Sequence, residues 1–329
     1  ARCAPRNAGP GGSIFCTSKK YAFLRQPIWK AYLMRDHKIR KDITIFGHRG
    51  ARGIYTENTM AGFRYLNEIG INAVELDVQN AANRVTVIAH DPYVLMPNTV
   101  NEKSCKKLIR ITEAKELTKV TAGAPCTGTE YTKQFPDQAR PSNRHIPTFA
   151  TFCKWAAKHP LLTLNVEIKS HAEQTDLYDP PDIIVSDVVD LLERHDLHHR
   201  CIISSFDWRV LEACAERAPT VTRGHLTLEQ NHGTAMVPNI VDGSPWMSGV
   251  TRKDHKDSLA QTIFALGGKV WCPYFKDLTE SELARAKELG LLVNVWTVNS
   301  VSDIIRMAEM GVDGIISDYP ARVQNILSQ

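Results

Sequence analysis

Residues 45–91 read IFGHRGARGIYTENTMAGFRYLNEIGINAVELDVQNAANRVTVIAHD, and this stretch decides the fold. It opens with a short β-branched and aromatic run that stops at Gly47, which predicts a strand followed by a loop. Apolar residues at helical spacing then continue to Ile69, and Gly70 is the type of residue that commonly ends a helix. Residues 73–78 form a second apolar run, which predicts another strand. The stretch therefore predicts a strand, a helix and a strand in succession.

Two predicted strands carry charged residues on one face. Glu75 and Asp77 lie two residues apart, so their side chains leave the same side of the second strand. Inside a protein these carboxylates would need a cation or strong hydrogen-bond donors, because burying an unpaired charge is costly. Residues 162–169, LTLNVEIK, repeat the pattern with Glu167 and Lys169 on one face. A surface ion pair would explain one such strand, but the repetition favours a functional site.

Strand and helix patterns alternate along most of the chain. The predicted strands start at eight positions: Ile43, Ala73, Leu162, Cys201, Thr220, Lys269, Leu292 and Asp313. Eight βα units predict an α/β fold of the (β/α)8 TIM-barrel type, with the helices outside. An open doubly wound sheet is the alternative, but no Gly-x-Gly-x-x-Gly turn follows any of these strands.

A TIM barrel would gather polar and aromatic side chains from distant segments at one mouth, because its active site is built at the carboxyl ends of the strands. The side chains predicted to converge there are His48, Glu75, Asp77, Glu167, Lys169, Ser205, Phe206, Trp296 and Asp318. For Phe206 and Trp296, packing in the core is an equal alternative to contact with a substrate.

Two segments interrupt the regular pattern. Residues 92–145 are rich in Pro, Thr and Asn, contain one expected helix at residues 112–119, and are too long for a simple βα connection. We expect them to form an inserted cap near the site. Residues 1–41 hold ten Lys or Arg and one acid, a net charge of +9, so the other residues carry 30 − 35, or −5. The predicted division is a basic N-terminal extension (1–41) and a barrel domain (42–329).

Composition and charge limit the kinds of partner that this protein is expected to bind. No apolar run approaches the ~20 residues of a membrane span. Nucleic acid is not an expected partner, because the excess of positive charge is confined to the extension. The extension could make a weak contact with an anionic membrane, although a solvated arm is the favoured alternative. A cytoplasmic location is favoured over a processed organellar or exported form, since no intact signal peptide is visible.

The eight cysteines contain no Cys-x-x-Cys pair, which argues against a zinc site of that type. Cys153, Cys201 and Cys272 lie in apolar segments and are predicted to be buried thiols. Cys105 and Cys126 share the irregular segment and could pair in an oxidising compartment.

Four short motifs occur in a fixed order near the start of the barrel. They are His48-Arg49-Gly50 after the first strand, Glu57-Asn58-Thr59 opening the first helix, Glu75-Leu76-Asp77 on the second strand, and His90-Asp91. The ordered set resembles the signature of the glycerophosphodiester phosphodiesterase family, and Glu167 and Lys169 resemble its Glu-x-Lys motif. The family often has proline before Glu57, where this chain has Thr56, a departure that concerns the loop rather than the chemistry.

The resemblance implies a role for each motif. Glu75, Asp77 and Glu167 would bind a divalent metal, and as hard oxygen ligands they suit Mg²⁺ or Ca²⁺ better than zinc. Arg49 and Lys169 would hold phosphoryl oxygens, Arg by its planar fork and Lys as a point charge.

His48 and His90 follow different strands and are predicted to form a general acid/base pair, with no assignment of which is which. Phe206 and Trp296 are candidate substrate contacts. Asp318 resembles part of the family's closing motif and is expected to orient the last loop.

The implied activity is metal-dependent hydrolysis of small glycerophosphodiesters, such as glycerophosphocholine or glycerophosphoethanolamine, to glycerol 3-phosphate and an alcohol. Two lipid-directed activities are alternatives: a lysophospholipase D, and a phosphodiesterase similar to the venom sphingomyelinase D enzymes. A catalytically silent phosphate-binding barrel is the alternative from another class, but none of the expected catalytic groups is missing.

Overall fold

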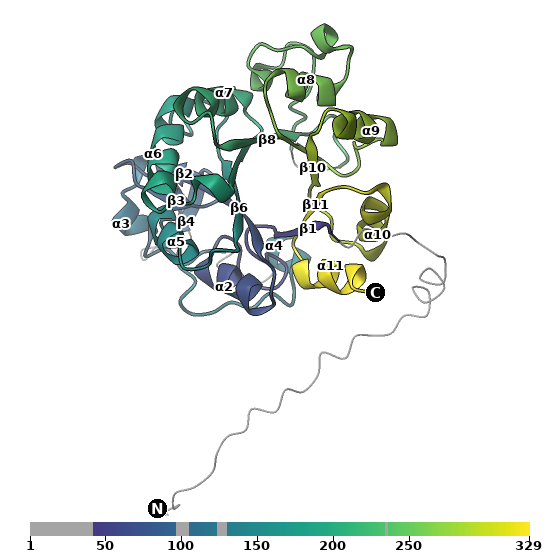
Figure 1. Ribbon diagram of the computed structural model, residues 1–329. Coiled ribbons are helices and arrows are strands. Elements are labelled where there is room, and N and C mark those ends of the chain that lie inside the picture. The colour runs from purple at the N-terminus through teal and green to yellow at the C-terminus, as the bar shows by residue number, and fades with distance from the viewer. Residues whose placement is uncertain (1–41, 97–104, 124–129, 234–235) are drawn as a thin grey trace, which may run out of the picture. The chain divides into compact units, whose positions relative to one another are not determined.

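Eight parallel strands close into a barrel in this computed structural model, which describes residues 42–96, 105–123, 130–233 and 236–329 (Figure 1). The strands are β1 (Thr44–Gly47), β2 (Ala73–Asn80), β6 (Thr163–Ile168), β7 (Cys201–Ser205), β8 (Thr222–Thr227), β9 (Val270–Pro273), β10 (Leu292–Val295) and β11 (Gly314–Ser317). They follow one another around the ring in chain order, and β1 pairs with both β11 and β2. The predicted TIM barrel is confirmed.

Helices form the outer ring (Figure 1). They are α2 (Met60–Glu68), α5 (Phe149–Ala156), α6 (Pro181–Arg194), α7 (Trp208–Arg217), α8 (Leu259–Ala265), α9 (Glu280–Glu288), α10 (Val301–Met310) and α11 (Pro320–Leu327). Short 3-10 helices lie at η2 (His198–Arg200), η3 (Pro245–Met247) and η4 (Arg252–His255). Hydroxyl or carboxylate caps start several helices; the Thr148 side chain, for example, accepts a hydrogen bond from the backbone of Thr151 at the start of α5. The last helix, α11, was not among the sequence predictions.

The inside of the barrel changes character along its axis. Its lower part is an apolar cluster made by Phe46, Ala73, Ile202, Leu226, Val270, Cys272 and Ile316. On β2 the apolar Ala73 is followed by Glu75 and Asp77, two and four residues nearer the carboxyl end. The pleat points all three side chains the same way, so an apolar floor gives way to a charged mouth. A larger apolar cluster fills the layer between strands and helices.

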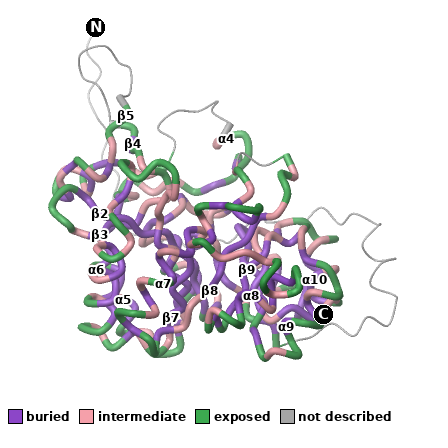
Figure 2. The backbone as a smooth tube through the Cα atoms, turned by 90° about the horizontal axis from the view of Figure 1, so that it is seen from above, coloured by how far each residue is buried: buried purple, intermediate pink, exposed green. Residues whose placement is uncertain are grey.

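The inserted segment lies over one end of the barrel (Figure 2). It contains β4 (Tyr93–Met96) paired with β5 (Cys105–Leu108), then η1 (Ile109–Ile111), α3 (Ala114–Leu117) and α4 (Glu130–Gln134). The preceding strand β3 (Thr86–Ile88) pairs antiparallel with β2. The helix expected over residues 112–119 is confirmed in a shorter form as α3, and the β4–β5 hairpin was not predicted. The segment has its own small apolar cluster, which includes Ile109 and Leu117.

Several expectations concern residues outside the described ranges. The basic extension lies wholly outside them, as does Cys126, so the proposed pairing with Cys105 is not described. Cys153, Cys201 and Cys272 are buried free thiols, as predicted. No helix within the described ranges is long and apolar enough to cross a bilayer.

Candidate active site

Three carboxylates converge at the mouth of the barrel. Glu75 and Asp77 come from β2 and Glu167 comes from β6, which pairs beside it with Asp77 opposite Glu167. One ligand oxygen from each carboxylate lies within 4.8 Å of the others. The exposed fraction of the side chain is 5% for Glu75, 1% for Asp77 and 12% for Glu167. Three carboxylates that could each carry a negative charge therefore lie close together, largely shielded from solvent.

The protein balances these charges unequally. Burial raises the pKa of Glu75 well above its usual value, and the nearby Asp77 and Glu167 raise it further. Burial also raises the pKa of Glu167, against the opposing effect of Lys169. For Asp77 burial is outweighed by Arg49, His90 and Lys169, so its pKa is lowered. Asp77 is therefore charged, whereas at Glu75 the Arg49 N–H and guanidinium only partly offset the rise in pKa.

Two oxygens in the cluster have no hydrogen-bond partner among the described residues. They are Oε1 of Glu75 and Oδ1 of Asp77, and both are buried. Buried oxygens of this kind are normally satisfied, since an unsatisfied charged acceptor is costly. A hard divalent cation would satisfy them with the all-oxygen donor set that Mg²⁺ and Ca²⁺ prefer. The residues present thus fit the expected metal.

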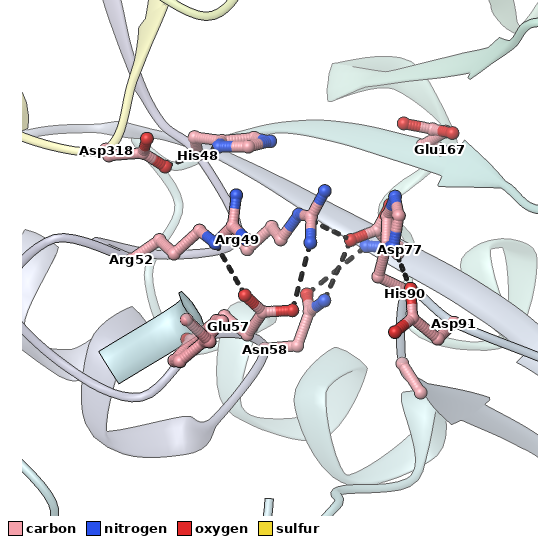
Figure 3. A network of polar contacts seen from close by, with 12 residues as sticks. His48, Arg49, Arg52, Glu57, Asn58, Asp77, His90, Asp91, Glu167 and Asp318 are labelled. Atoms are coloured by element: carbon pink, nitrogen blue, oxygen red, sulfur yellow. Dashed lines mark hydrogen bonds and ion pairs between the residues drawn. The ribbon is translucent and has the colours of Figure 1, made fainter. Parts of the chain in front are cut away.

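Two positively charged side chains, those of Arg49 and Lys169, lie beside the carboxylates. The backbone N–H of Arg49 donates to Glu75 Oε2 (2.7 Å), and its guanidinium makes ion pairs with Glu57 (Nη1–Oε1 2.9 Å) and Asp77 (Nε–Oδ2 3.3 Å). Lys169 contacts Glu167 and lies 3.6 Å from Asp77 Oδ1. Figure 3 shows the Arg49 guanidinium between His48 on one side and His90 on the other.

His48 is held by a carboxylate from the far end of the chain. Its Nδ1 lies 2.6 Å from Oδ1 of Asp318, and its Nε2 lies 3.9 Å from Glu75 Oε2. Asp318 is 2% exposed and accepts a second hydrogen bond from Asn299 (2.6 Å). Burial lowers the pKa of His48, and Asp318 opposes that shift. The bond to Asp318 leaves Nε2 as the ring atom that faces the carboxylates.

His90 repeats this arrangement. Its Nδ1 lies 2.6 Å from Oδ1 of the adjacent Asp91. Burial, followed by the positive charges of Arg49 and Lys169, lowers the pKa of His90 to about 4. Both shifts favour the neutral imidazole, and in each ring one nitrogen is held by a carboxylate.

The structure gives the site contacts that the sequence reasoning did not identify. Asp318, which was expected at the mouth, orients the last loop through Asn299 and also contacts His48. Its partner is 270 residues away, so no local pattern could have indicated the pair. Asn58, which was quoted only as part of a motif, donates to Asp77 Oδ2 (2.8 Å). Asp91 could have been found, because it directly follows His90.

The predicted aromatic residues line another part of the mouth. Phe206 and Trp296 are partly buried, and their rings meet edge to face with centroids 5.2 Å apart. Both pack against the apolar floor, and the Trp296 indole N–H donates to the Cys272 carbonyl (2.8 Å). Core packing thus accounts for part of the contacts of both rings. The expectation for Ser205 was wrong, because its buried hydroxyl donates to the Ile168 carbonyl (2.9 Å) instead of facing the site.

Known proteins resemble this chain over most of its length. A curated glycerophosphodiester phosphodiesterase from Caldanaerobacter subterraneus subsp. tengcongensis is 26% identical over 283 residues, covering 86% of this chain and 97% of the relative. A solved Silicibacter pomeroyi protein assigned to the same activity is 31% identical, with a TM-score of 0.75 over 87% of this chain and 93% of that one.

A third match shares the fold at lower identity. It is an Oleispira antarctica phosphodiesterase solved in complex with the product sn-glycerol-3-phosphate, and it is 20% identical with a TM-score of 0.63 over 87% of this chain and 97% of that one. The model of the glycerophosphoryl diester phosphodiesterase family matches residues 48–322, which span the barrel from His48 through the last strand and into the last helix. The chain belongs to the glycerophosphoryl diester phosphodiesterase family of enzymes.

Proposed function

We propose that this enzyme hydrolyses small glycerophosphodiesters, such as glycerophosphocholine or glycerophosphoethanolamine, to glycerol 3-phosphate and an alcohol. The observation that carries the proposal is the buried carboxylate cluster with two unsatisfied oxygens, bordered by two His–Asp pairs and two cations. Family membership supports the reaction class, and the product complex of the Oleispira antarctica protein supports glycerol 3-phosphate as the product.

Glu75, Asp77 and Glu167 would hold a divalent cation, Mg²⁺ or Ca²⁺. When bound, the cation supplies positive charge that stabilises the developing charge on phosphoryl and hydroxyl oxygens. Arg49 and Lys169 are the protein's own contribution to that stabilisation. The Arg49 fork would bind two phosphoryl oxygens, and the Lys169 ammonium would bind one as a compact charge.

His48 and His90 would move the protons. Each ring has Nδ1 fixed by a carboxylate, so Nε2 is the atom available to the substrate. One neutral imidazole accepts the proton of the glycerol hydroxyl as that oxygen attacks phosphorus. The other, in its protonated form, donates to the alcohol oxygen as the P–O bond breaks. In a second step water opens the cyclic phosphate, with the two imidazoles in exchanged roles.

Phe206 and Trp296 would contact the apolar side of the glycerol unit. The two residues directly follow β7 and β10, and their partly buried rings pack against the apolar floor. An aromatic surface of this kind binds the C–H face of a small polyol without a competing polar group.

The test is release of glycerol 3-phosphate from glycerophosphocholine, compared with turnover of lysophosphatidylcholine, in Mg²⁺, Ca²⁺ or chelator. We expect chelator-sensitive release from glycerophosphocholine, and a fall in kcat of about 10²- to 10⁴-fold for His48→Ala because proton transfer is lost. Turnover of the lysolipid alone would move the enzyme to the lysophospholipase D class. Binding of phosphate with no turnover of either compound would indicate a silent barrel.

Asp318→Asn tests whether the Asp318 carboxylate holds the His48 ring in its working tautomer. The amide keeps the shape but can no longer hold His48 in the same tautomer, so we expect kcat to fall by about 10- to 10³-fold with little change in KM. Asp190→Asn is the matched control, because Asp190 is half-exposed on α6 and pairs with Arg217 outside the barrel. Equal kcat values for Asp318→Asn and wild type would remove Asp318 from the site.

A further inference from the structure

Arg52 lies in the loop between β1 and α2, at the place where this loop contacts the inserted segment. Its guanidinium carbon is 5.3 Å from the centroid of the Tyr131 ring and 4.7 Å from that of Phe135. Both rings belong to the inserted segment, in α4 and directly after it. Cation–π contacts with two rings fix a side chain that would otherwise be free to move.

The backbone beside Arg52 is fastened to the same segment. The Gln138 side chain donates to the Arg52 carbonyl (2.7 Å) and to the Tyr131 hydroxyl (2.9 Å). The Ala139 N–H donates to the Ile54 carbonyl (2.7 Å), and the Thr56 N–H donates to the Ala139 carbonyl (3.2 Å). The position of Arg52 therefore depends on the inserted segment as well as on the barrel.

One carboxylate links Arg52 to the phosphoryl-binding arginine proposed above. Glu57 pairs with Arg49 through Oε1 (2.9 Å) and with Arg52 Nε through Oε2 (2.6 Å). Figure 3 shows the two arginine side chains beside one another, between Glu57 and His48. Arg52 also contributes to the lowered pKa of His48, as expected for a positive charge near that ring.

The two terminal nitrogens of Arg52 are hydrogen-bond donors that could bind a ligand. The Arg52 side chain is 18% exposed, its ion pair with Glu57 is made through Nε, and its two terminal Nη groups make no hydrogen bond to the described residues. The remaining Nη groups match the spacing of two oxygens of one phosphoryl group, the bidentate geometry at which arginine excels.

We propose that Arg52 is a second arginine contact for the substrate phosphoryl group, brought to the site by the inserted segment. The proposal rests on the proposed function of the site. Glu57 would then act as the common brace of two phosphoryl-binding guanidinium groups, and Tyr131 and Phe135 as the residues that position the second one.

The competing explanation is that Arg52 acts only through Glu57, by orienting that carboxylate against Arg49. A double-mutant cycle separates the two. If Arg52 binds phosphate itself, Arg52→Gln still weakens binding in a Glu57→Gln background. If it acts only through Glu57, Arg52→Gln has no further effect there.

The experiment is calorimetric titration of the full chain with glycerol 3-phosphate and with inorganic phosphate, at one fixed Mg²⁺ concentration. We expect Arg52→Gln to weaken both affinities by about 10- to 100-fold, the usual effect of losing charge-assisted hydrogen bonds. Arg52→Lys should recover only part of the loss, because an ammonium lacks the fork. Arg217→Gln, outside the barrel on α7, is the control and should bind like wild type.

A second pair of variants tests the supporting rings. Tyr131→Ala with Phe135→Leu should weaken phosphate binding in the same direction as Arg52→Gln, whereas Tyr131→Phe should not. Thermal unfolding of each variant shows whether it is folded. Wild-type affinity in Arg52→Gln would overturn the inference while leaving hydrolysis by the wild type intact. Absence of both hydrolysis and phosphate binding in the wild type would overturn the proposed function itself, and this inference with it.

Discussion

Glu75 has surroundings that suit a carboxylate only in the presence of a cation. Its Oε2 accepts the Arg49 N–H, but its Oε1 is buried without a partner among the described residues. Asp77, by contrast, has the Asn58 amide and the Arg49 guanidinium. The two acids are two residues apart on one strand, yet the protein lowers the pKa of Asp77 and leaves that of Glu75 raised. We infer that this difference between Glu75 and Asp77 favours the binding of a metal ion beside Glu75.

Glu75→Gln provides a test of stability against pH. The pKa of Glu75 is raised in the fold above its ordinary 4.5, so the protonated form stabilises the metal-free protein at low pH, and that contribution is lost as pH rises through the raised value. The metal-free wild type should therefore lose stability with rising pH, and Glu75→Gln should lose less. Each kcal/mol relieved corresponds to roughly 2–4 °C in Tm.

The measurement is Tm in chelator and in excess Mg²⁺ or Ca²⁺, from pH 5 to pH 8. Cation should stabilise the wild type most at the upper end of this range and should stabilise Glu75→Gln little. Glu193→Gln, half-exposed on α6, is the control. A wild-type Tm independent of both pH and cation would contradict the role given to Glu75.

At the scale of elements, the connection from β1 to α2 places most of the polar groups in position. His48 and Arg49 follow β1 directly, and Arg49 adopts a left-handed backbone conformation (φ 48°). The turn is tight: the N–H of Gly50 donates to the carbonyl oxygens of Gly47 (3.2 Å) and Glu75 (3.1 Å). The end of β1, the loop and β2 are thus fixed to one another, and so are the side chains that they carry.

Gly47→Ala should disturb this connection. An added Cβ would lie 1.9 Å from the Gly50 carbonyl oxygen and 2.6 Å from the Leu66 side chain, so the backbone must move. We expect a loss of about 1–3 kcal/mol in the free energy of unfolding, and loss of turnover in the protein that remains folded.

Gly70→Ala is the matched control for Gly47→Ala. Gly70 also requires glycine, for its φ of +74°, but has nothing within 4 Å of an added Cβ. It should cost about 1–2 kcal/mol through backbone strain and leave turnover unchanged. Urea unfolding and turnover of both variants provide the comparison, and equal turnover in the two would show that the β1 turn does not position the site.

At the scale of the whole barrel, closure brings the first and last barrel strands together. β1 pairs with β11 along its length, which sets His48 against Asp318. Closure also seals the interior: Cys272 lies in the apolar floor, and Cys153, Cys201 and Cys214 lie in the layer between strands and helices. Burial raises the pKa of all four thiols.

These thiols report on closure. In a variant with the other four cysteines replaced by serine, Ellman's reagent should find no fast-reacting thiol in the native protein and four in urea. The reagent requires an accessible thiolate, and burial opposes both access and ionisation. Fast reaction of Cys272 in the native state would mean that the barrel opens readily. The same variant treated in urea supplies the reference of four thiols.

The sequence by itself determined the barrel and most of its chemistry. Apolar runs at a period of two, alternating with runs at a period of 3.6, placed all eight strands within two residues of where they start. The alternation of side chains along β2 and β6 likewise placed the three carboxylates on one face. These features are local, because a short window contains both the pattern and its consequence.

Only the tertiary structure decided which groups meet across the ring. The contact of His48 with Asp318 and the contact of Arg52 with Tyr131 and Phe135 join segments far apart in the sequence, and no periodicity encodes such pairs. The β4–β5 hairpin was missed for a related reason, since its short strands are defined by pairing with each other. For Ser205 the predicted position at a strand end was correct, but the predicted role was not. Its hydroxyl donates a hydrogen bond to the backbone carbonyl of Ile168. The chain fixes where a side chain emerges, and packing in three dimensions decides what it touches.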